Sequence, residues 1–241
     1  MKLEEIVKEI KSKTDNAVVS LSGGLDSTIL TYLLVEALGK ENVACISFDY
    51  NQRHDIELKK AKTTTKHLGI EHKIVDISFL GDIVKDVSAM VKGEVATPSV
   101  HDILGDPQPV TYVPNRNMIL SSITASYCEA VGFNTVAMGI QAIDSYSYWD
   151  TTPDFANAIN DIFALNRKSN MQIITPFVNM TKVDEIKLGL EMGVIFEDTH
   201  TCYNPVDVEG SDPKSCGVCP SCAERLAAFE AVGMTDPLEY K

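Results

Sequence analysis

Short apolar runs alternate with stretches of helical period along most of this chain, and this alternation restricts the fold more than any other feature of the sequence. The strand-like runs cover residues 17–21, 43–48, 72–77, 135–140 and 172–177. The helical stretches cover residues 27–38, 55–68, 117–131, 153–167 and 182–192. Strands that alternate with helices of about 10 to 15 residues form parallel sheets with helices on both faces. We therefore predict an α/β fold that binds its ligands at the carboxyl ends of the strands.

The alternation is interrupted twice. Residues 93–112 contain three prolines among polar residues, which predicts a surface excursion near the site. After residue 195 the pattern gives way to Thr, Asn, Pro, Asp, Gly and Cys, with one more helix expected at about 222–232. We expect an α/β domain over residues 1–195 and a small C-terminal appendage over residues 196–241.

Composition and charge exclude several classes of protein. The chain has 241 residues, 44% of them hydrophobic, and a net charge of −13. A domain of this length buries enough apolar surface to fold without a covalent staple. The acidic balance disfavours a stable complex with nucleic acid, whose phosphates attract Lys and Arg. The short basic cluster at Lys59, Lys60, Lys62 and Lys66 has the spacing of an exposed helix face. No apolar run reaches the roughly 20 residues of a membrane span, and the first residues lack the apolar centre of a secretory signal, so we expect a cytoplasmic protein.

The string Ser22-Gly23-Gly24-Leu25-Asp26-Ser27 stands between the first predicted strand and the first predicted helix. Glycines allow the backbone to turn tightly and to approach a ligand closely. A helix that starts near Ser27 directs its free N–H groups and the positive end of its dipole into this turn. The string therefore predicts a pyrophosphate cradle, with an ordinary capped turn as the alternative. The residues expected to form the cradle are Leu21, Ser22, Gly23, Gly24, Leu25, Asp26, Ser27 and Thr28.

Two further points define this loop chemically. No Gly-Lys-Ser/Thr follows the glycines, so the loop is not the P-loop of phosphate-transferring enzymes. Asp26 is an acidic residue beside the expected phosphates, and this placement implies a magnesium ion between them.

Four of the six cysteines lie close together near the C-terminus. They are Cys202, Cys216, Cys219 and Cys222. In a reducing compartment such a cluster favours a metal ion over disulfides. Four thiolates suit tetrahedral zinc in a closed structural site, and an iron–sulfur cluster is the alternative. Cys45 and Cys128 stand alone in apolar segments, which predicts that they are buried.

The glycine string resembles the PP-loop of the ATP pyrophosphatase superfamily, whose fold is an adenine-nucleotide α-hydrolase type of parallel sheet. Three further strings narrow the resemblance. They are Phe48-Asp49-Tyr50-Asn51-Gln52-Arg53-His54, Val113-Pro114-Asn115-Arg116-Asn117 and Cys216-Gly217-Val218-Cys219-Pro220-Ser221-Cys222. Together they resemble the 7-cyano-7-deazaguanine (preQ0) synthase family of the queuosine and archaeosine pathways, over about residues 17–229.

This resemblance implies an ATP-dependent ligase that cleaves ATP between its α and β phosphates. ATP would adenylate 7-carboxy-7-deazaguanine, and ammonia would displace AMP to give an amide. A second ATP would activate the amide oxygen, whose departure leaves the nitrile. ATP, magnesium and zinc are the implied cofactors, and a homodimer is the implied assembly.

The resemblance also implies roles for individual residues. Arg116, with Asn115 and Asn117, would line the nucleotide or substrate side, with a helix N-cap by Asn115 as the alternative. Arg53 and His54 would meet a phosphate or the substrate carboxylate, or else pair with surface acids. The expected catalytic residues are Asp26, Arg53, His54, Arg116 and Lys182. The expected substrate-binding residues are Asp144, Tyr148 and Asp154.

The sequence departs from the family pattern at three places. The family's Tyr-Pro-Asp-Cys string is replaced by Tyr148-Trp149-Asp150-Thr151-Thr152-Pro153-Asp154. Asn51 stands where the family has glycine, and the segment from Cys202 to Cys216 is longer than usual. These departures leave open a diverged ligase for another 7-deazaguanine or another acceptor. A PP-loop enzyme that modifies tRNA is the other alternative, against which the acidic charge and the lack of a separate tRNA-binding region argue.

Overall fold

A five-stranded parallel sheet forms the centre of the molecule. The computed structural model describes residues 2–103, 106, 108–142 and 148–241. The strands are β1 (Ala17–Ser20), β2 (Val43–Asp49), β3 (Glu71–Asp76), β4 (Thr135–Ala137) and β5 (Gln172–Ile174). Their order is β3-β2-β1-β4-β5, and each neighbouring pair is parallel. The chain thus builds outward from β1 in one direction and then in the other, and ligands bind at such a switch point in open α/β sheets.

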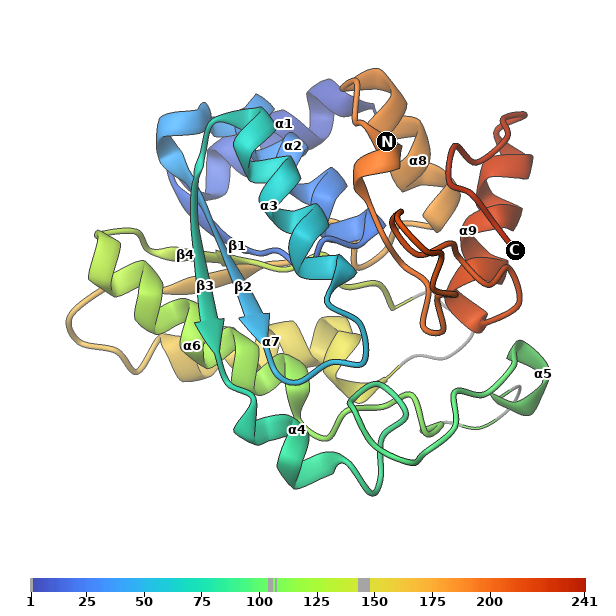
Figure 1. Ribbon diagram of the computed structural model, residues 1–241. Helices are drawn as coiled ribbons and strands as arrows, with labels where there is room; N and C mark the ends of the chain where they lie inside the picture. Colours follow the sequence, from blue (N-terminus) through green and yellow to red (C-terminus); the bar gives the residue numbers. More distant parts are fainter. Residues whose placement is uncertain (1, 104–105, 107, 143–147) are drawn as a thin grey trace.

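Helices cover both faces of the sheet, as predicted (Figure 1). One face carries α1 (Leu3–Lys13), α2 (Leu25–Leu38), α3 (Ile56–Leu68) and α8 (Lys182–Glu191). The other carries α6 (Arg116–Val131) and α7 (Pro153–Phe163). Each face has its own apolar core, because alternate side chains of a strand point to opposite faces. Val19 belongs to the first core and Val18 to the second.

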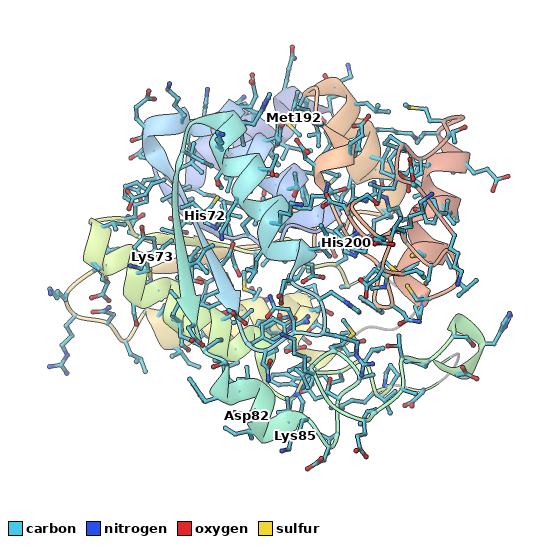
Figure 2. All side chains as sticks on the ribbon, in the orientation of Figure 1. His72, Lys73, Asp82, Lys85, Met192 and His200 are labelled. Atoms are coloured by element: carbon cyan, nitrogen blue, oxygen red, sulfur yellow. The ribbon has the colours of Figure 1, made fainter. Side chains whose placement is uncertain are left out.

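The remaining elements are short or lie in the C-terminal segment. They are η1 (Lys40–Asn42), α4 (Phe79–Val84), α5 (Val100–Ile103), η2 (Trp149–Thr151), η3 (Phe196–Asp198) and α9 (Pro220–Ala231). Side chains fill the space between the sheet and the helices on each face (Figure 2). Cys45 and Cys128 are fully buried in these cores, which confirms their predicted place. No helix in the described ranges is long and apolar enough to cross a bilayer.

Several element ends differ from the sequence prediction. The strands expected at 135–140 and 172–177 end at Ala137 and Ile174. Met138 still donates its backbone N–H to Ile174, at 3.1 Å, but the chain then leaves the sheet. Gly139, Ile140 and Gln141 go on to line a cavity. Their apolar pattern reflects burial beside that cavity, and strand pairing ends earlier.

Residues 196–241 pack closely against the α/β part. The rings of Phe196 and Phe229 meet edge to face at 5.2 Å, and both residues belong to the same core as α1, α2 and α8. Lys59 of α3 is exposed, as predicted, whereas the side chain of Lys60 is mostly buried against this segment. Both form ion pairs with Asp212. The segment therefore shares a core with the rest of the chain. The domain boundary expected at 195/196 stays a prediction.

Candidate active site and cysteine centre

A cavity of about 260 Å³ opens at the carboxyl ends of β1, β2 and β4. Its wall comes from the glycine string, the turn after β2, the turn after β4, the start of α6 and the C-terminal segment. Nine residues singled out in the sequence line it. They are Leu21, Ser22, Gly24, Leu25, Asp26, Ser27, Arg116, Asn117 and Tyr148. The sheet edge thus brings together the predicted phosphate and substrate residues.

Gly23 has a backbone requirement of its own. Its φ is +85°, in the left-handed region that favours glycine. A Cβ atom at this position would lie 2.1 Å from the carbonyl oxygen of Glu57 in the first turn of α3. Gly23 therefore lets the loop pack against α3 and does not itself line the cavity formed by the described residues. Thr28, the last residue of the predicted cradle, is buried and also lies outside that wall.

The start of α2 suits an anion. The helix begins at Leu25, two residues earlier than predicted, and no side chain caps its first turn in the described structure. The hydroxyls of Ser22 and Ser27 lie 2.9 Å apart, and the N–H of Gly24 donates to Ser22 Oγ at 3.1 Å. The first N–H groups of a helix have no partner within the helix. Here they face the glycine turn, where phosphate oxygens would satisfy them.

Lys182 and Asp26 meet at the edge of this loop. Asp26 lies in the first turn of α2, and Lys182 is the first residue of α8. Lys182 Nζ donates to Asp26 Oδ1 at 2.7 Å, and both side chains are mostly buried. The N-cap Thr181 and Asp184 form a capping box that fixes the start of α8. Two residues that are 156 positions apart are therefore held as an ion pair beside the expected phosphates.

The C-terminal segment closes over the glycine turn. His200 is buried between α3 and this segment (Figure 2), and its backbone N–H donates to the carbonyl of Gly23 at 2.9 Å. Burial lowers the pKa of His200 to about 4, so the ring is neutral at physiological pH. His200, Thr201 and Tyr203 add to the cavity wall. The loop conformation thus depends on residues at both ends of the chain.

Arg53 and His54 lie one layer away from the main cavity. They line a separate space of about 10 Å³ between the turn after β2 and the cysteine segment. Arg53 Nη2 donates to the carbonyl of Val95 at 2.6 Å, which ties this turn to the residues that cover it. Burial, together with the charge of Arg53, lowers the pKa of His54. Among the described residues, neither side chain contributes to the wall of the larger cavity.

The turn before α6 holds Arg116 at the cavity. Asn115 is left-handed with φ 56°, and its exposed side chain makes no capping hydrogen bond. Asn117 is buried and bonds Asp150 twice: its N–H reaches Oδ2 at 3.2 Å, and its amide reaches the Asp150 carbonyl at 3.0 Å. Burial lowers the pKa of Arg116, but the neighbouring Tyr50 and Asp150 raise this pKa by more, so the guanidinium stays protonated.

Only part of the predicted substrate segment reaches the cavity. Tyr148 lines it, and its hydroxyl lies 2.6 Å from Thr111 Oγ1. Asp154 is exposed in the first turn of α7 and, within the described ranges, is not part of the wall. Asp144 lies outside the described residues. The buried acid of this segment is Asp150, which braces the start of α6.

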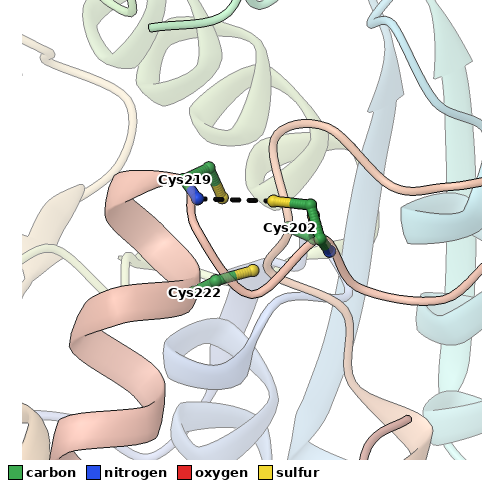
Figure 3. Close-up of side chains that lie close together, drawn as sticks. Cys202, Cys219 and Cys222 are labelled. Atoms are coloured by element: carbon green, nitrogen blue, oxygen red, sulfur yellow. Dashed lines mark hydrogen bonds between the residues drawn. The ribbon is translucent and has the colours of Figure 1, made fainter. Parts of the chain in front are cut away.

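The four C-terminal cysteines form a compact centre. Their sulfur atoms all lie within 4.8 Å of one another, and Figure 3 shows the thiols of Cys202, Cys219 and Cys222 converging. In a tetrahedron with zinc–sulfur bonds of about 2.3 Å, the sulfurs are about 3.8 Å apart, so a small contraction completes the site. Backbone N–H groups of Asn204 and Cys216 donate to Cys202 Sγ at 3.3 and 3.2 Å. Such hydrogen bonds stabilise the thiolate form of cysteine, which is the form that binds metals. The four cysteines therefore fit a metal ion.

Comparison with known proteins identifies the family. The family model described as queuosine biosynthesis protein QueC matches residues 16–233. The chain belongs to the QueC family. Relatives named 7-cyano-7-deazaguanine synthase support this. The chain is 38% identical to the one from Pseudoalteromonas translucida over 95% of its own length and 100% of the relative's. It is 40% identical to the one from Thermoplasma acidophilum, over 93% of this chain and 92% of the relative.

Two solved structures share part of their fold with this QueC-family chain. An NH3-dependent NAD synthetase from Campylobacter jejuni matches with a TM-score of 0.47 and 16% identity, over 81% of this chain and 75% of that one. An NMN synthetase from Francisella tularensis matches with a TM-score of 0.49 and 14% identity, over 98% and 88%. The family assignment does not depend on these overlaps.

The site of this QueC-family chain also contains residues that sequence reasoning missed. Cavity-lining residues of this kind are Tyr50, Glu57, Gln141, Tyr203 and Glu224. Tyr50 stands inside the Phe48–His54 string, so the resemblance contained a signal for it. The others come from unrelated segments and meet only in the folded chain. Gln141 is buried and donates to Glu185, a fully buried acid of α8.

Proposed function

We propose that this chain is a 7-cyano-7-deazaguanine synthase of queuosine biosynthesis, which joins ammonia to 7-carboxy-7-deazaguanine at the expense of ATP. The observation that carries the proposal is a single cavity that the uncapped start of α2, Asp26, Arg116 and Tyr148 all line. A nucleotide triphosphate and a planar acid need such a shared space for one to react with the other. The family assignment indicates which reaction takes place in this cavity.

The reaction has two activations, and the residues position the reactants for each. The substrate carboxylate attacks the α-phosphorus of ATP and releases pyrophosphate, and ammonia then displaces AMP with loss of a proton. In the second round the amide oxygen attacks the α-phosphorus of another ATP and releases a second pyrophosphate. AMP then leaves with that oxygen as the carbon–nitrogen triple bond forms and the remaining two nitrogen protons are lost. Positioning and charge neutralisation are the main contributions of the protein in such transfers.

The glycine loop and Lys182 serve the phosphates. The N–H groups at the start of α2 and the hydroxyls of Ser22 and Ser27 would donate hydrogen bonds to phosphate oxygens. Magnesium, bound by Asp26, would neutralise the charge of the leaving pyrophosphate. Lys182 holds Asp26 in the ligand-free chain and lies within reach of the same phosphates. Arg116, which stays protonated, supplies a fixed positive charge beside the reacting carboxylate.

The cysteine centre serves the fold. Cys202, Cys216, Cys219 and Cys222 would hold zinc with all four positions filled, which leaves no open position for substrate. The zinc would fix the segment that carries His200, Thr201 and Tyr203 to the cavity wall.

We further propose free ammonia as the nitrogen source, a homodimer as the assembly and the cytoplasm as the location. Sedimentation of the purified protein tests the dimer.

The deciding experiment measures pyrophosphate release from ATP with ammonium and 7-carboxy-7-deazaguanine, and follows the base by mass spectrometry. We expect pyrophosphate release coupled to nitrile formation, with AMP as the other product. Formation of ADP and phosphate would overturn the mechanism. ATP binding without turnover of this base would point to a different 7-deazaguanine, and a panel of 7-substituted bases would then identify it.

A further inference from the structure

One end of the cavity is aromatic and lies around Arg116. Tyr50, Tyr148 and Tyr203 line this end, and each is close enough to Arg116 for its charge to act on their pKa values. Aromatic rings and a guanidinium are the surfaces on which planar heterocycles stack. The same cavity is also lined by the glycine string and the start of α2, which suit phosphates. Its wall therefore offers groups for both a base and a triphosphate.

Glu57 adds a carboxylate to the aromatic end. It lies in the first turn of α3 and lines the main cavity. Within the described part of the chain its carboxylate has no hydrogen-bond or ion-pair partner; Asp26, by contrast, is bound by Lys182, and Asp150 accepts from Asn117. Burial raises the pKa of Glu57 to about 7, against the opposing charge of Arg116. A half-buried carboxylate without a hydrogen-bond partner is stabilised most by a ligand that donates N–H hydrogen bonds to it.

The chemistry of the carboxylate selects the kind of base. A carboxylate only accepts hydrogen bonds, through two oxygens that lie side by side. The pyrimidine edge of a 7-deazaguanine presents two adjacent donors, the ring N–H and the 2-amino group. The corresponding edge of adenine alternates a donor with an acceptor, and that acceptor would face a carboxylate oxygen. Glu57 therefore suits the deazaguanine better than the adenine of ATP.

We propose that Glu57 binds the ring N–H and the 2-amino group of the 7-deazaguanine and thereby determines the specificity of the site for that base. This inference rests on the proposed function. The backbone of Glu57 packs directly against Gly23, as the 2.1 Å approach of a Cβ atom there shows. The carboxylate that holds the base is thus fixed relative to the loop that holds the phosphates. The far edge of the base, which carries the reacting carboxylate, can then be presented to the α-phosphate.

The test combines one substitution with one change in the substrate. The wild type and Glu57→Gln are assayed with 7-carboxy-7-deazaguanine and with the analogue that lacks its 2-amino group. We expect removal of the amino group to lower kcat/KM of the wild type about 10- to 100-fold, as loss of a charged hydrogen bond does. In Glu57→Gln, kcat/KM for 7-carboxy-7-deazaguanine should fall by a similar factor. Removal of the amino group from the base should then lower kcat/KM of this variant less than about threefold. The KM for ATP should stay unchanged.

Controls separate recognition from damage. Glu191→Gln changes an exposed glutamate of α8 and should behave as the wild type toward both bases. Melting temperature and metal content are measured for each variant, and Glu57→Asp, which retains the carboxylate, should keep part of the preference for the amino group. Equal loss with both bases in Glu57→Gln, or a raised KM for ATP alone, would overturn the inference. Failure of the wild type to convert either base would instead contradict the proposed function.

Discussion

Asp26 is the residue on which the proposed chemistry depends most directly. It stands at the start of α2, lines the cavity and is paired with Lys182. We expect Asp26→Ala to lower pyrophosphate release at least 1,000-fold (about 4 kcal/mol of transition-state stabilisation), because the metal that neutralises the phosphates loses its ligand. The content of zinc, which we propose at the four cysteines, and the melting temperature should remain those of the wild type. Asp15→Ala, at an exposed position, is the matched control; loss of zinc in Asp26→Ala would show damage to the fold instead.

Individual positions differ in how far the sequence predicted them. Asn51 replaces the family's glycine, and its φ of 62° shows why asparagine, which tolerates left-handed backbone, suits this turn. Gly23 was expected to approach a phosphate, whereas the structure shows it packed against Glu57. The residue type indicated an unusual backbone in both cases. It did not indicate which neighbour required it, because that neighbour comes from another element.

Among the elements, the turn that follows β4 packs tightly against the start of α2, which lines the cavity. A Cβ atom on Gly139 would lie 3.1 Å from both the carbonyl carbon of Asp26 and the N–H nitrogen of Ser27. Backbone atoms form both contacts, so Gly139→Ala must shift the first turn of α2 by a few tenths of an ångström. We expect weaker ATP binding, by about 10-fold, with a loss of unfolding free energy of about 1 to 2 kcal/mol. Calorimetric titration with ATP and urea unfolding measure the two effects.

A substitution of the same type elsewhere serves as the control for Gly139. Gly132 has φ 77° at the end of α6, with no atom near its Cβ position. Gly132→Ala should cost stability through backbone strain and leave ATP affinity unchanged. Unchanged ATP affinity in Gly139→Ala would show that the start of α2 tolerates displacement.

His72 links three elements and makes their packing sensitive to pH. Its Nε2 lies 2.7 Å from Ser47 Oγ of β2, and its Nδ1 lies 3.1 Å from Thr65 Oγ1 of α3. Burial lowers its pKa from 6.5 to about 4. The unfolded chain therefore binds the proton more readily, so the contribution of His72 to stability is complete above about pH 6.5 and declines as the pH falls toward 4.

The comparison of wild type with His72→Gln isolates this effect. Urea midpoints are measured between pH 4 and pH 7.5 for both proteins. The difference in unfolding free energy between them should shrink as the pH falls below 6.5, because only the wild type carries this titrating group. A difference that is independent of pH would contradict the assignment.

The elements themselves were predicted well, and the cavity was predicted only in part. Alternating apolar runs are local signals, and they located the five strands and the main helices to within a few residues. Glu57 and Gln141 gave no local signal, because a cavity wall is built from segments that meet only after folding. Asp154 was expected beside the substrate, but the chain turns so that Asp150 is the acid buried beside α6. Asp144 and the individual roles of the site residues remain predictions.

At the scale of the whole molecule, a buried ion pair fixes the fold of the C-terminal segment, which forms part of the cavity wall. Arg225 and Asp236 are almost completely buried; Arg225 Nε reaches Asp236 Oδ2 at 2.6 Å, and Nη1 reaches Thr199 Oγ1 at 2.6 Å. Asp236→Ala leaves a buried guanidinium without its carboxylate, which should cost about 3 to 5 kcal/mol of unfolding free energy. ATP affinity should fall as well, since Thr199 precedes the residue that bonds Gly23.

Urea unfolding and ATP titration measure both consequences. A double variant, Arg225→Met with Asp236→Leu, removes the charges together and should regain most of the lost stability. Its ATP affinity then reports on Thr199 alone. If Asp236→Ala lowered the unfolding free energy by less than about 1 kcal/mol, apolar contacts such as those of Phe229 would be the main stabilisation of the C-terminal segment.

The hydrogen bond from His200 to Gly23 has a consequence for the order in which the protein matures during translation. Gly23 is synthesised well before His200, so its carbonyl receives its partner only after residue 200 has emerged from the ribosome. The cysteine centre that fixes this partner also needs Cys222. A partly made chain can therefore form its sheet early, while its nucleotide loop stays unfinished. Competence to activate a substrate is therefore acquired only after the segment from His200 to Cys222 has been made and has folded over the loop.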